Sequence, residues 1–192
     1  ILKLKVTEVD AVPVLNNTIN RFAVGFKQKQ ISVQCFTQDS EMLMPLDVDK
    51  FDKILTNLVS NALKYSPEES SIKIDMAFVD KTSVETLFAD SSGIDSDSWL
   101  KVVVADTGIG IPKDKQKAVF ERFYQIEHST RQSTWGTGIG LFYTQQLVNL
   151  HYGFIKCESN TPKGTVFTFV LPQNIELYKD FIDNTNESPM DD

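Results

Sequence analysis

The chain has 192 residues, of which 41% are hydrophobic and 23% are charged, and its formal net charge is −7. This length and composition favour one globular domain with its own core. They exclude a membrane span, because no apolar run approaches the roughly 18 residues that a span needs. The N-terminal run ILKLKVTEVD lacks the apolar core of a signal peptide. We therefore expect a cytoplasmic segment without membrane insertion, although a longer parent chain could be anchored.

The negative charge gathers at the C-terminal end. Residues 174–192 hold six acidic residues and one lysine, which leaves the other 173 residues near −2. Nucleic acid binding needs clustered Lys and Arg, so no nucleic acid partner is expected. Residues 173–192 are expected to form an acidic tail or linker, with a short helix at about 174–183 and a disordered end.

The two cysteines, Cys35 and Cys157, predict no metal site, because no Cys or His spacing near them is typical of zinc. In the alternating run ISVQCF, Ile31, Val33 and Cys35 would share one face of a strand. This pattern predicts that Cys35 is a reduced thiol in the core.

Hydrophobic periodicity predicts a series of helices and strands. In chain order they are a strand at 3–9, a helix at 11–29, a strand at 31–36, a helix from Asp47 or Asp49 to about Tyr65, a strand at 71–79, a hairpin insertion at 80–98, a strand at 99–106, a short helix near 115–123, a helix from the glycines near 136–140 to about Tyr152, and strands at 154–159 and 165–171. The nearly continuous valines of 99–106 are typical of a central buried strand. Strands beside helices predict an α/β two-layer sandwich over residues 1–172.

The long helix ending near Tyr65 carries the first candidate site residues. Asn57 and Asn61 lie four apart and Lys64 lies three further on, so the three share one face. An amide oxygen can coordinate Mg²⁺, which takes few protein ligands beside phosphate oxygens and water, and a lysine can pair with a phosphate. The alternative is an ordinary solvated helix face. Asparagine is a mediocre helix former, however, so two asparagines on adjacent turns favour a functional role.

A second segment, VVVADTGIGIP, ends a buried strand in an acid and two glycines. Asp106 at the end of the strand could accept a hydrogen bond from an exocyclic amine such as adenine N6. Gly108 and Gly110 permit close backbone approach and unusual dihedrals. A tight turn after the strand is the alternative.

A third segment, GTGIGL, places Gly136, Gly138 and Gly140 just before a helix. The free backbone N–H groups at a helix start can hold anions. The spacing is neither the dinucleotide fingerprint nor a P-loop, since no GK[ST] follows. A flexible hinge is the alternative.

Residues 113–135 lie between the two glycine segments and are rich in Lys and Arg, including Arg122 and Arg131. Such a segment suits a mobile cover over a polyanion, with Phe120, Phe123 and Tyr124 as anchors to the core. A solvated loop is an equal alternative.

Taken together, NLVSNALKYSP, DTGIGIP, FERFYQ and GTGIGL resemble the N, G1, F and G2 boxes of the catalytic, ATP-binding domain of two-component histidine kinases. PKGTVFTFVLP is similar to the closing strand pair of that family, so the resemblance covers about residues 1–172. It implies the GHKL or Bergerat fold, a mixed sheet packed on three helices, with ATP and Mg²⁺ as ligands. The insertion at 80–98 and the tail after 172 resemble hybrid kinases that continue into receiver domains.

The resemblance also implies a role for each matching position. Asn57, Asn61, Lys64 and Arg122 form the expected catalytic set, with Asn61 as the Mg²⁺ ligand. Tyr65 should stack near the adenine, Asp106 should read its N6, and Thr165 should support Asp106. The remaining expected nucleotide contacts are Gly108, Gly110, Ile111, Phe123, Arg131, Gly136, Thr137, Gly138, Ile139, Gly140 and Leu141.

The residue type at one position differs between members of this superfamily that transfer a phosphoryl group and members that hydrolyse ATP. Gyrase-type and heat-shock-chaperone members usually place a Glu at the position of Asn57, and an amide is a poor general base. The resemblance therefore favours phosphoryl transfer to a protein in a two-component signalling system. A GHKL ATPase that hydrolyses ATP and a nucleotide-binding regulatory module without phosphotransfer are the alternatives.

Neither histidine of the chain, His128 or His151, lies in the family's phosphoacceptor context. The resemblance thus implies a histidine on a separate dimerisation domain of the same parent protein, and a response regulator receiver domain downstream. It also implies that the parent is a membrane-anchored sensor kinase with this domain in the cytoplasm.

Overall fold

The computed structural model describes residues 3–125 and 138–181. Its centre is a five-stranded mixed sheet in the order β2-β4-β5-β7-β6. The strands are β2 (Ser32–Thr37), β4 (Ser71–Asp80), β5 (Ser98–Asp106), β6 (Phe154–Ser159) and β7 (Thr165–Pro172). The β2–β4 pair is parallel and the other three pairs are antiparallel. The valine-rich strand β5 occupies the middle, as its sequence predicts.

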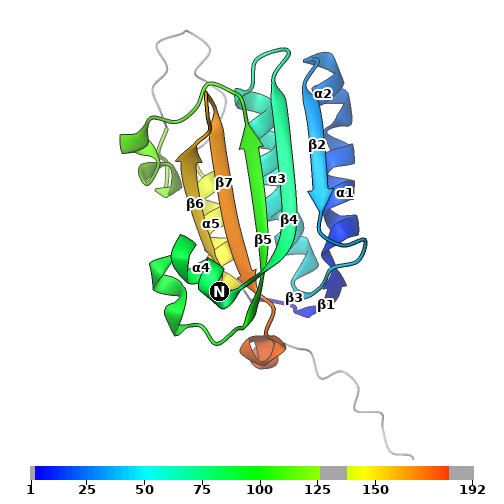
Figure 1. The fold of residues 1–192 in the computed structure, drawn as a ribbon, viewed down its shortest axis with the longest axis vertical. Helices are drawn as coiled ribbons and strands as arrows, with labels where there is room; N and C mark the ends of the chain where they lie inside the picture. Colours follow the sequence, from blue (N-terminus) through cyan, green and yellow to red (C-terminus); the bar gives the residue numbers. More distant parts are fainter. Residues whose placement is uncertain (1–2, 126–137, 182–192) are drawn as a thin grey trace, which may run out of the picture.

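Three helices cover one face of this sheet, namely α1 (Ala11–Arg21), α3 (Val48–Tyr65) and α5 (Gly140–Leu150) (Figure 1). This arrangement confirms the two-layer α/β sandwich with a mixed sheet on three helices. Helix α3 begins where the Asp47 side chain accepts a hydrogen bond from Lys50 N at 3.1 Å, and it ends before Pro67. Its capping and its stop therefore follow from local sequence.

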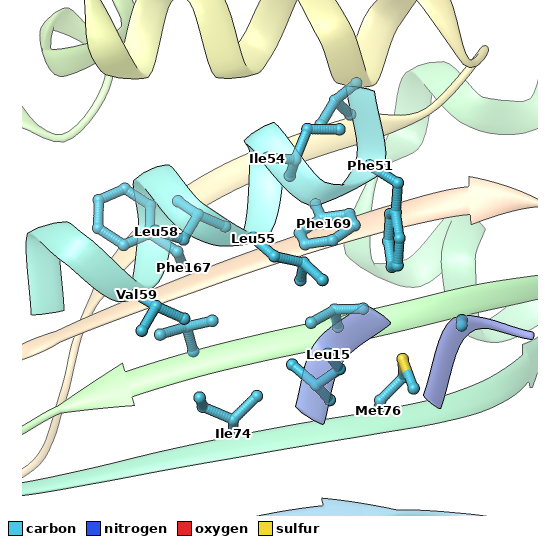
Figure 2. Packing of buried hydrophobic residues seen from close by; sticks show 14 of the residues in the cluster. Leu15, Phe51, Ile54, Leu55, Leu58, Val59, Ile74, Met76, Phe167 and Phe169 are labelled. Atoms are coloured by element: carbon cyan, nitrogen blue, oxygen red, sulfur yellow. The ribbon is translucent and has the colours of Figure 1, made fainter. Parts of the chain in front are cut away.

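The core lies between the buried stripe of α3 and the sheet, as Figure 2 shows. The stripe repeats at helical spacing and consists of Phe51, Ile54, Leu55, Leu58, Val59 and Ala62. Phe51 packs edge-on against Phe169 of β7, with ring centroids 6.3 Å apart. Burial of this stripe fixes which face of α3 turns outward.

The N-terminal third differs from the sequence prediction in three respects. The predicted strand at 3–9 is β1 (Thr7–Asp10), and it pairs with a strand that was not predicted, β3 (Leu43–Leu46). Strand β3 escapes a pattern search because it has four residues and contains a proline. The predicted helix at 11–29 is two helices, because the backbone breaks at Phe22 between α1 and α2 (Ala23–Gln28).

Residues 80–98 are helical, and the prediction of a hairpin was wrong. They form α4 (Lys81–Leu87), capped by Asp80, and the 3-10 helix η1 (Ala89–Gly93). Val84 packs with Trp99 and Val170 in a separate buried cluster. The insertion thus covers part of the sheet face opposite to α1, α3 and α5 (Figure 1).

Three further expectations need correction. The short helix near 115–123 is two 3-10 turns, η2 (Lys113–Lys115) and η3 (Ala118–Phe120). The helix at 174–183 is the 3-10 helix η4 (Ile175–Phe181), whose Tyr178 is fully buried against Leu4 and Val6. Cys35 is exposed rather than in the core, because β2 is an edge strand whose core-facing side is covered at Ile31 and Val33 but not as far as Cys35.

Across residues 3–125 and 138–181, none of the helices is long and apolar enough to cross a bilayer.

Candidate functional site

Asp106 is a buried carboxylate at the end of the central strand. It is 4% exposed and lies opposite Thr165 in the β5–β7 register. Its Oδ1 accepts hydrogen bonds from Gly108 N at 2.8 Å and from Thr165 N at 3.2 Å. Its Oδ2 receives no hydrogen bond from the part of the chain that the structure describes. Burial raises the pKa of Asp106, and the two backbone hydrogen bonds oppose that rise.

The glycine loop after Asp106 is held against the C-terminal end of α3. Ile109 N donates to the Tyr65 carbonyl at 3.1 Å, and a Cβ on Gly108 would collide with the same carbonyl. Gly110 has a φ of +78°, a conformation that only glycine adopts without strain. The loop therefore runs from the sheet to α3 because both glycines lack side chains.

Two residues that the sequence analysis missed complete the surroundings of Asp106. Asn160 Nδ2 donates to the Asp106 carbonyl at 2.8 Å. Gly164, with a φ of +118°, leaves no room for a Cβ beside that carbonyl. The available signal was the turn NTPKG immediately before Thr165, which brings both residues back to the end of β5.

Asn57 lies on α3 about two turns before Tyr65 and contacts helix α5. Its Nδ2 donates to Thr144 Oγ1 at 2.6 Å. A Cβ on Gly140 would lie 2.6 Å from Asn57 Oδ1. Thr144 was not predicted, because nothing in the sequence indicates which α5 residue faces α3.

The other predicted residues of α3 turn to solvent. The side chain of Asn61 is partly exposed and forms no hydrogen bond within residues 3–125 and 138–181. Lys64 Nζ lies 4.7 Å from the centre of the Tyr65 ring, and Tyr65 is 41% exposed. These side chains are free to meet a ligand, as their predicted roles require.

Phe123, which lies within the segment 113–135 predicted as a cover, contacts Gly138, three residues beyond that segment. Phe123 N donates to the Gly138 carbonyl at 2.9 Å, and both residues have φ near +65°. The Arg122 guanidinium lies 4.7 Å from the centre of the Phe123 ring, and Phe123 is 61% exposed. The predicted residues Arg131, Gly136 and Thr137 lie outside the described residues.

The remaining predicted contacts divide by burial. Ile111 and Leu141 pack against the main core, whereas Ile139 is 37% exposed next to the start of α5. An open pocket of about 400 Å³ adjoins the α5 start and includes Asn57 and Gly140 in its wall. The full lining is Arg21, Asp52, Lys53, Thr56, Asn57, Ser60, Gly140 and Tyr143.

The structure thus gathers the predicted residues in two groups along the C-terminal half of α3. One group surrounds Asp106 beside Tyr65, and the other surrounds Asn57 beside Gly140. Tyr65 lies eight positions after Asn57, which corresponds to about 12 Å along the helix axis.

The family model described as "Histidine kinase-, DNA gyrase B-, and HSP90-like ATPase" matches residues 46–175, a range that includes both groups. The chain belongs to this family. Within it, the chain is 32% identical over 173 residues to the sensor histidine kinase WalK of Bacillus subtilis. That alignment covers 90% of this chain and 26% of WalK, so the chain spans about a quarter of that relative.

Solved histidine kinases have the same fold. The catalytic domain of ThkA superposes with a TM-score of 0.71 and 23% identity over 90% of this chain and 99% of that domain. ThkA is also known in complex with the response regulator protein TrrA. Full-length ShkA in complex with AMPPNP matches with a TM-score of 0.69 and 23% identity, over 89% of this chain and 32% of ShkA.

Proposed function

We propose that this domain binds Mg·ATP and transfers the γ-phosphoryl group to a histidine on a separate dimerisation domain. The observation that carries the proposal is Asp106, a buried carboxylate with one oxygen occupied by backbone N–H groups and the other free of protein donors in the described chain. The free oxygen can accept a hydrogen bond from an amine of a ligand.

At this end of the site, the free oxygen of Asp106 accepts a hydrogen bond from the adenine N6 amine. The low dielectric around a 4% exposed carboxylate strengthens such a bond. The exposed ring of Tyr65 can stack on the base. Thr165 supports the carboxylate through its backbone N–H.

At the other end, the triphosphate lies against Asn57, Asn61 and Lys64. Helix α5 begins at Gly140, and Gly138 lies two residues before it. The free N–H groups at a helix start favour phosphate oxygens. No group of three or more His, Cys, Asp or Glu side chains that could hold a metal occurs in the described ranges. An amide ligand such as Asn61 therefore suits Mg²⁺ that is shared with phosphate and water. When bound, Mg²⁺ neutralises charge on the phosphate oxygens.

The transfer itself needs little covalent chemistry from this chain. An imidazole nitrogen of the acceptor histidine attacks the γ-phosphorus, an N–P bond forms, and the bond to the β,γ-bridging oxygen breaks to release ADP. Lys64 and Arg122 stabilise the spread negative charge, and the glycine loop holds the nucleotide in line. Asn57, as an amide, does not activate water for competing hydrolysis.

Two partners follow from this proposal. The first is the dimerisation and histidine phosphotransfer domain of the same parent protein, and the second is a response regulator receiver domain. The TrrA complex of ThkA and the relationship to WalK, of which this chain spans about 26%, support both. We propose a cytoplasmic location for the domain within a membrane-anchored sensor kinase.

The decisive experiment combines the chain with the purified acceptor domain of its parent protein and γ-labelled ATP. The expected result is acid-labile label on a histidine of the acceptor domain, which Asp106→Asn should prevent. Asp80→Asn is the matched control, because Asp80 lies at the opposite end of the β4–β5 pair from the Asp106 end. ATP binding without label on the acceptor would support a regulatory module instead, and steady phosphate release without transfer would support an ATPase.

A further inference from the structure

Asn57 is held from two sides by the first turns of α5. Thr144 is 1% exposed, and its Oγ1 lies 2.6 Å from Asn57 Nδ2. Gly140 lies four residues earlier, so both residues share one face of α5. That face turns toward α3, and the contact joins residues 87 positions apart in the chain.

Gly140 closes the other side of the carboxamide. A Cβ built on Gly140 would lie 2.6 Å from Asn57 Oδ1 and 3.3 Å from Asn57 Cγ. The absence of a side chain at Gly140 therefore leaves just enough space for the amide oxygen. The amide nitrogen lies against Thr144, and the oxygen lies on the Gly140 side.

The two ends of the amide have different neighbours. The nitrogen end contacts the buried Thr144 hydroxyl, and the oxygen end lies on the side of Gly140. Asn57 and Gly140 both line the open pocket beside the α5 start, whereas Thr144 does not. A carboxamide can present an oxygen or an NH₂ group, and only the oxygen can accept from a Mg²⁺-bound water or coordinate the cation.

We propose that Thr144 is a positioning residue that orients the Asn57 carboxamide with its oxygen toward the metal–phosphate end of the site. The proposal rests on the proposed function, since it takes Mg·ATP as the ligand. Without the hydroxyl, the partly buried amide nitrogen loses its acceptor, and the carboxamide can rotate to place N–H groups toward the cation. The Thr144 hydroxyl therefore contributes to Mg·ATP binding without touching the ligand.

Calorimetric titration of ATP into the 192-residue chain tests this proposal, once with Mg²⁺ and once with a chelator. Thr144→Val should weaken binding of Mg·ATP by about three- to tenfold, the range expected for one lost hydrogen bond. Binding without Mg²⁺ should change by less than about twofold, because the amide orientation matters mainly to the metal. Thr144→Ser keeps the hydroxyl and should restore wild-type Mg·ATP affinity.

Thr168→Val is the matched control, because it makes the same change at a buried threonine within β7. It should leave both affinities unchanged. If circular dichroism shows that Thr144→Val is unfolded, Thr144→Ala replaces it in the same comparison. Unchanged Mg·ATP affinity, or an equal loss with and without Mg²⁺, would overturn the positioning role. Failure of the wild-type chain to bind ATP at all would instead overturn the proposed function.

Discussion

The backbone of Gly164 passes the carbonyl oxygen of Asp106 so closely that no side chain fits between them. Gly164 also has a φ of +118°, and its N–H and carbonyl lie in the turn that leads back to Thr165, the strand partner of Asp106. The turn after β6 thus fixes the position of the carboxylate that the proposed function assigns to adenine.

Gly164→Ala should therefore destabilise the domain and weaken ATP binding together. The added methyl group strains the backbone at a positive φ and displaces Asp106. Together these effects should lower the free energy of unfolding by about 3 kcal/mol. Chemical denaturation and ATP titration measure the two effects. Gly93→Ala is the control, because nothing lies within 4 Å of its added Cβ and its φ is not positive. Equal behaviour of the two variants would show that the Gly164 turn does not hold Asp106.

Asp106→Asn should weaken ATP binding without lowering the stability of the fold. The new amide has two possible orientations, and both are unfavourable. If its oxygen accepts from Gly108 N and Thr165 N, its NH₂ group faces the adenine amine, and two donors meet. In the reverse orientation, the NH₂ group faces the two backbone N–H donors. ATP affinity should fall about 10- to 100-fold. Because burial raises the pKa of Asp106 above its ordinary 3.8, ionisation costs stability at neutral pH. The thermal midpoint of the unliganded variant should thus equal or exceed that of the wild type; a lower midpoint or unchanged affinity would contradict this account.

Asp47→Ala should strongly destabilise the fold. Asp47 caps α3 through Lys50 N, accepts a hydrogen bond from Lys5 N at 2.8 Å, and forms an ion pair with Lys50 Nζ at 2.6 Å. Its loss leaves the nearly buried ammonium of Lys50 unpaired, which together with the lost cap should cost about 2–4 kcal/mol. Asp80→Ala removes the exposed cap of α4 and should have a much smaller effect in the same urea titration. Similar losses would mean that the ion pair adds nothing beyond capping.

Stability should fall as the pH drops below about 6.5 because of His151. This fully buried ring accepts from Asp47 N at 3.3 Å through Nε2, so its proton lies on Nδ1, which is 2.8 Å from the Leu147 carbonyl. Burial lowers the pKa of His151 below its ordinary 6.5, while Asp47 opposes and Lys50 reinforces that shift. The unfolded chain therefore binds a proton at a pH where the folded chain does not.

Unfolding free energies measured between pH 8 and pH 5.5 test this dependence. The slope from one such group approaches at most about 1.4 kcal/mol per pH unit. His151→Gln retains an acceptor for Asp47 N without a titrating ring, so the slope in this pH range should largely disappear. A wild-type stability that stays constant down to pH 5.5 would refute the buried neutral histidine.

Patterns that are local in the chain predicted a large part of this fold. The apolar stripe from Phe51 to Ala62 repeats every three or four residues, so periodicity alone defined α3 and its buried face. The valine run of β5 likewise predicted a central strand that ends in Asp106 and two glycines. By contrast, the sequence did not predict α4, because its short apolar pattern is buried only by contact with Trp99 and Val170.

The same distinction between local sequence and tertiary structure applies to the candidate site. The sequence by itself determined which residue types were present and in what order: amides on one helix face, an acid at a strand end, and glycines before a helix. Only the tertiary structure decided their partners, since Thr165 and Thr144 reach Asp106 and Asn57 across 59 and 87 positions of the chain. Hydrogen bonds of that kind depend on strand register and helix packing, which no local propensity specifies.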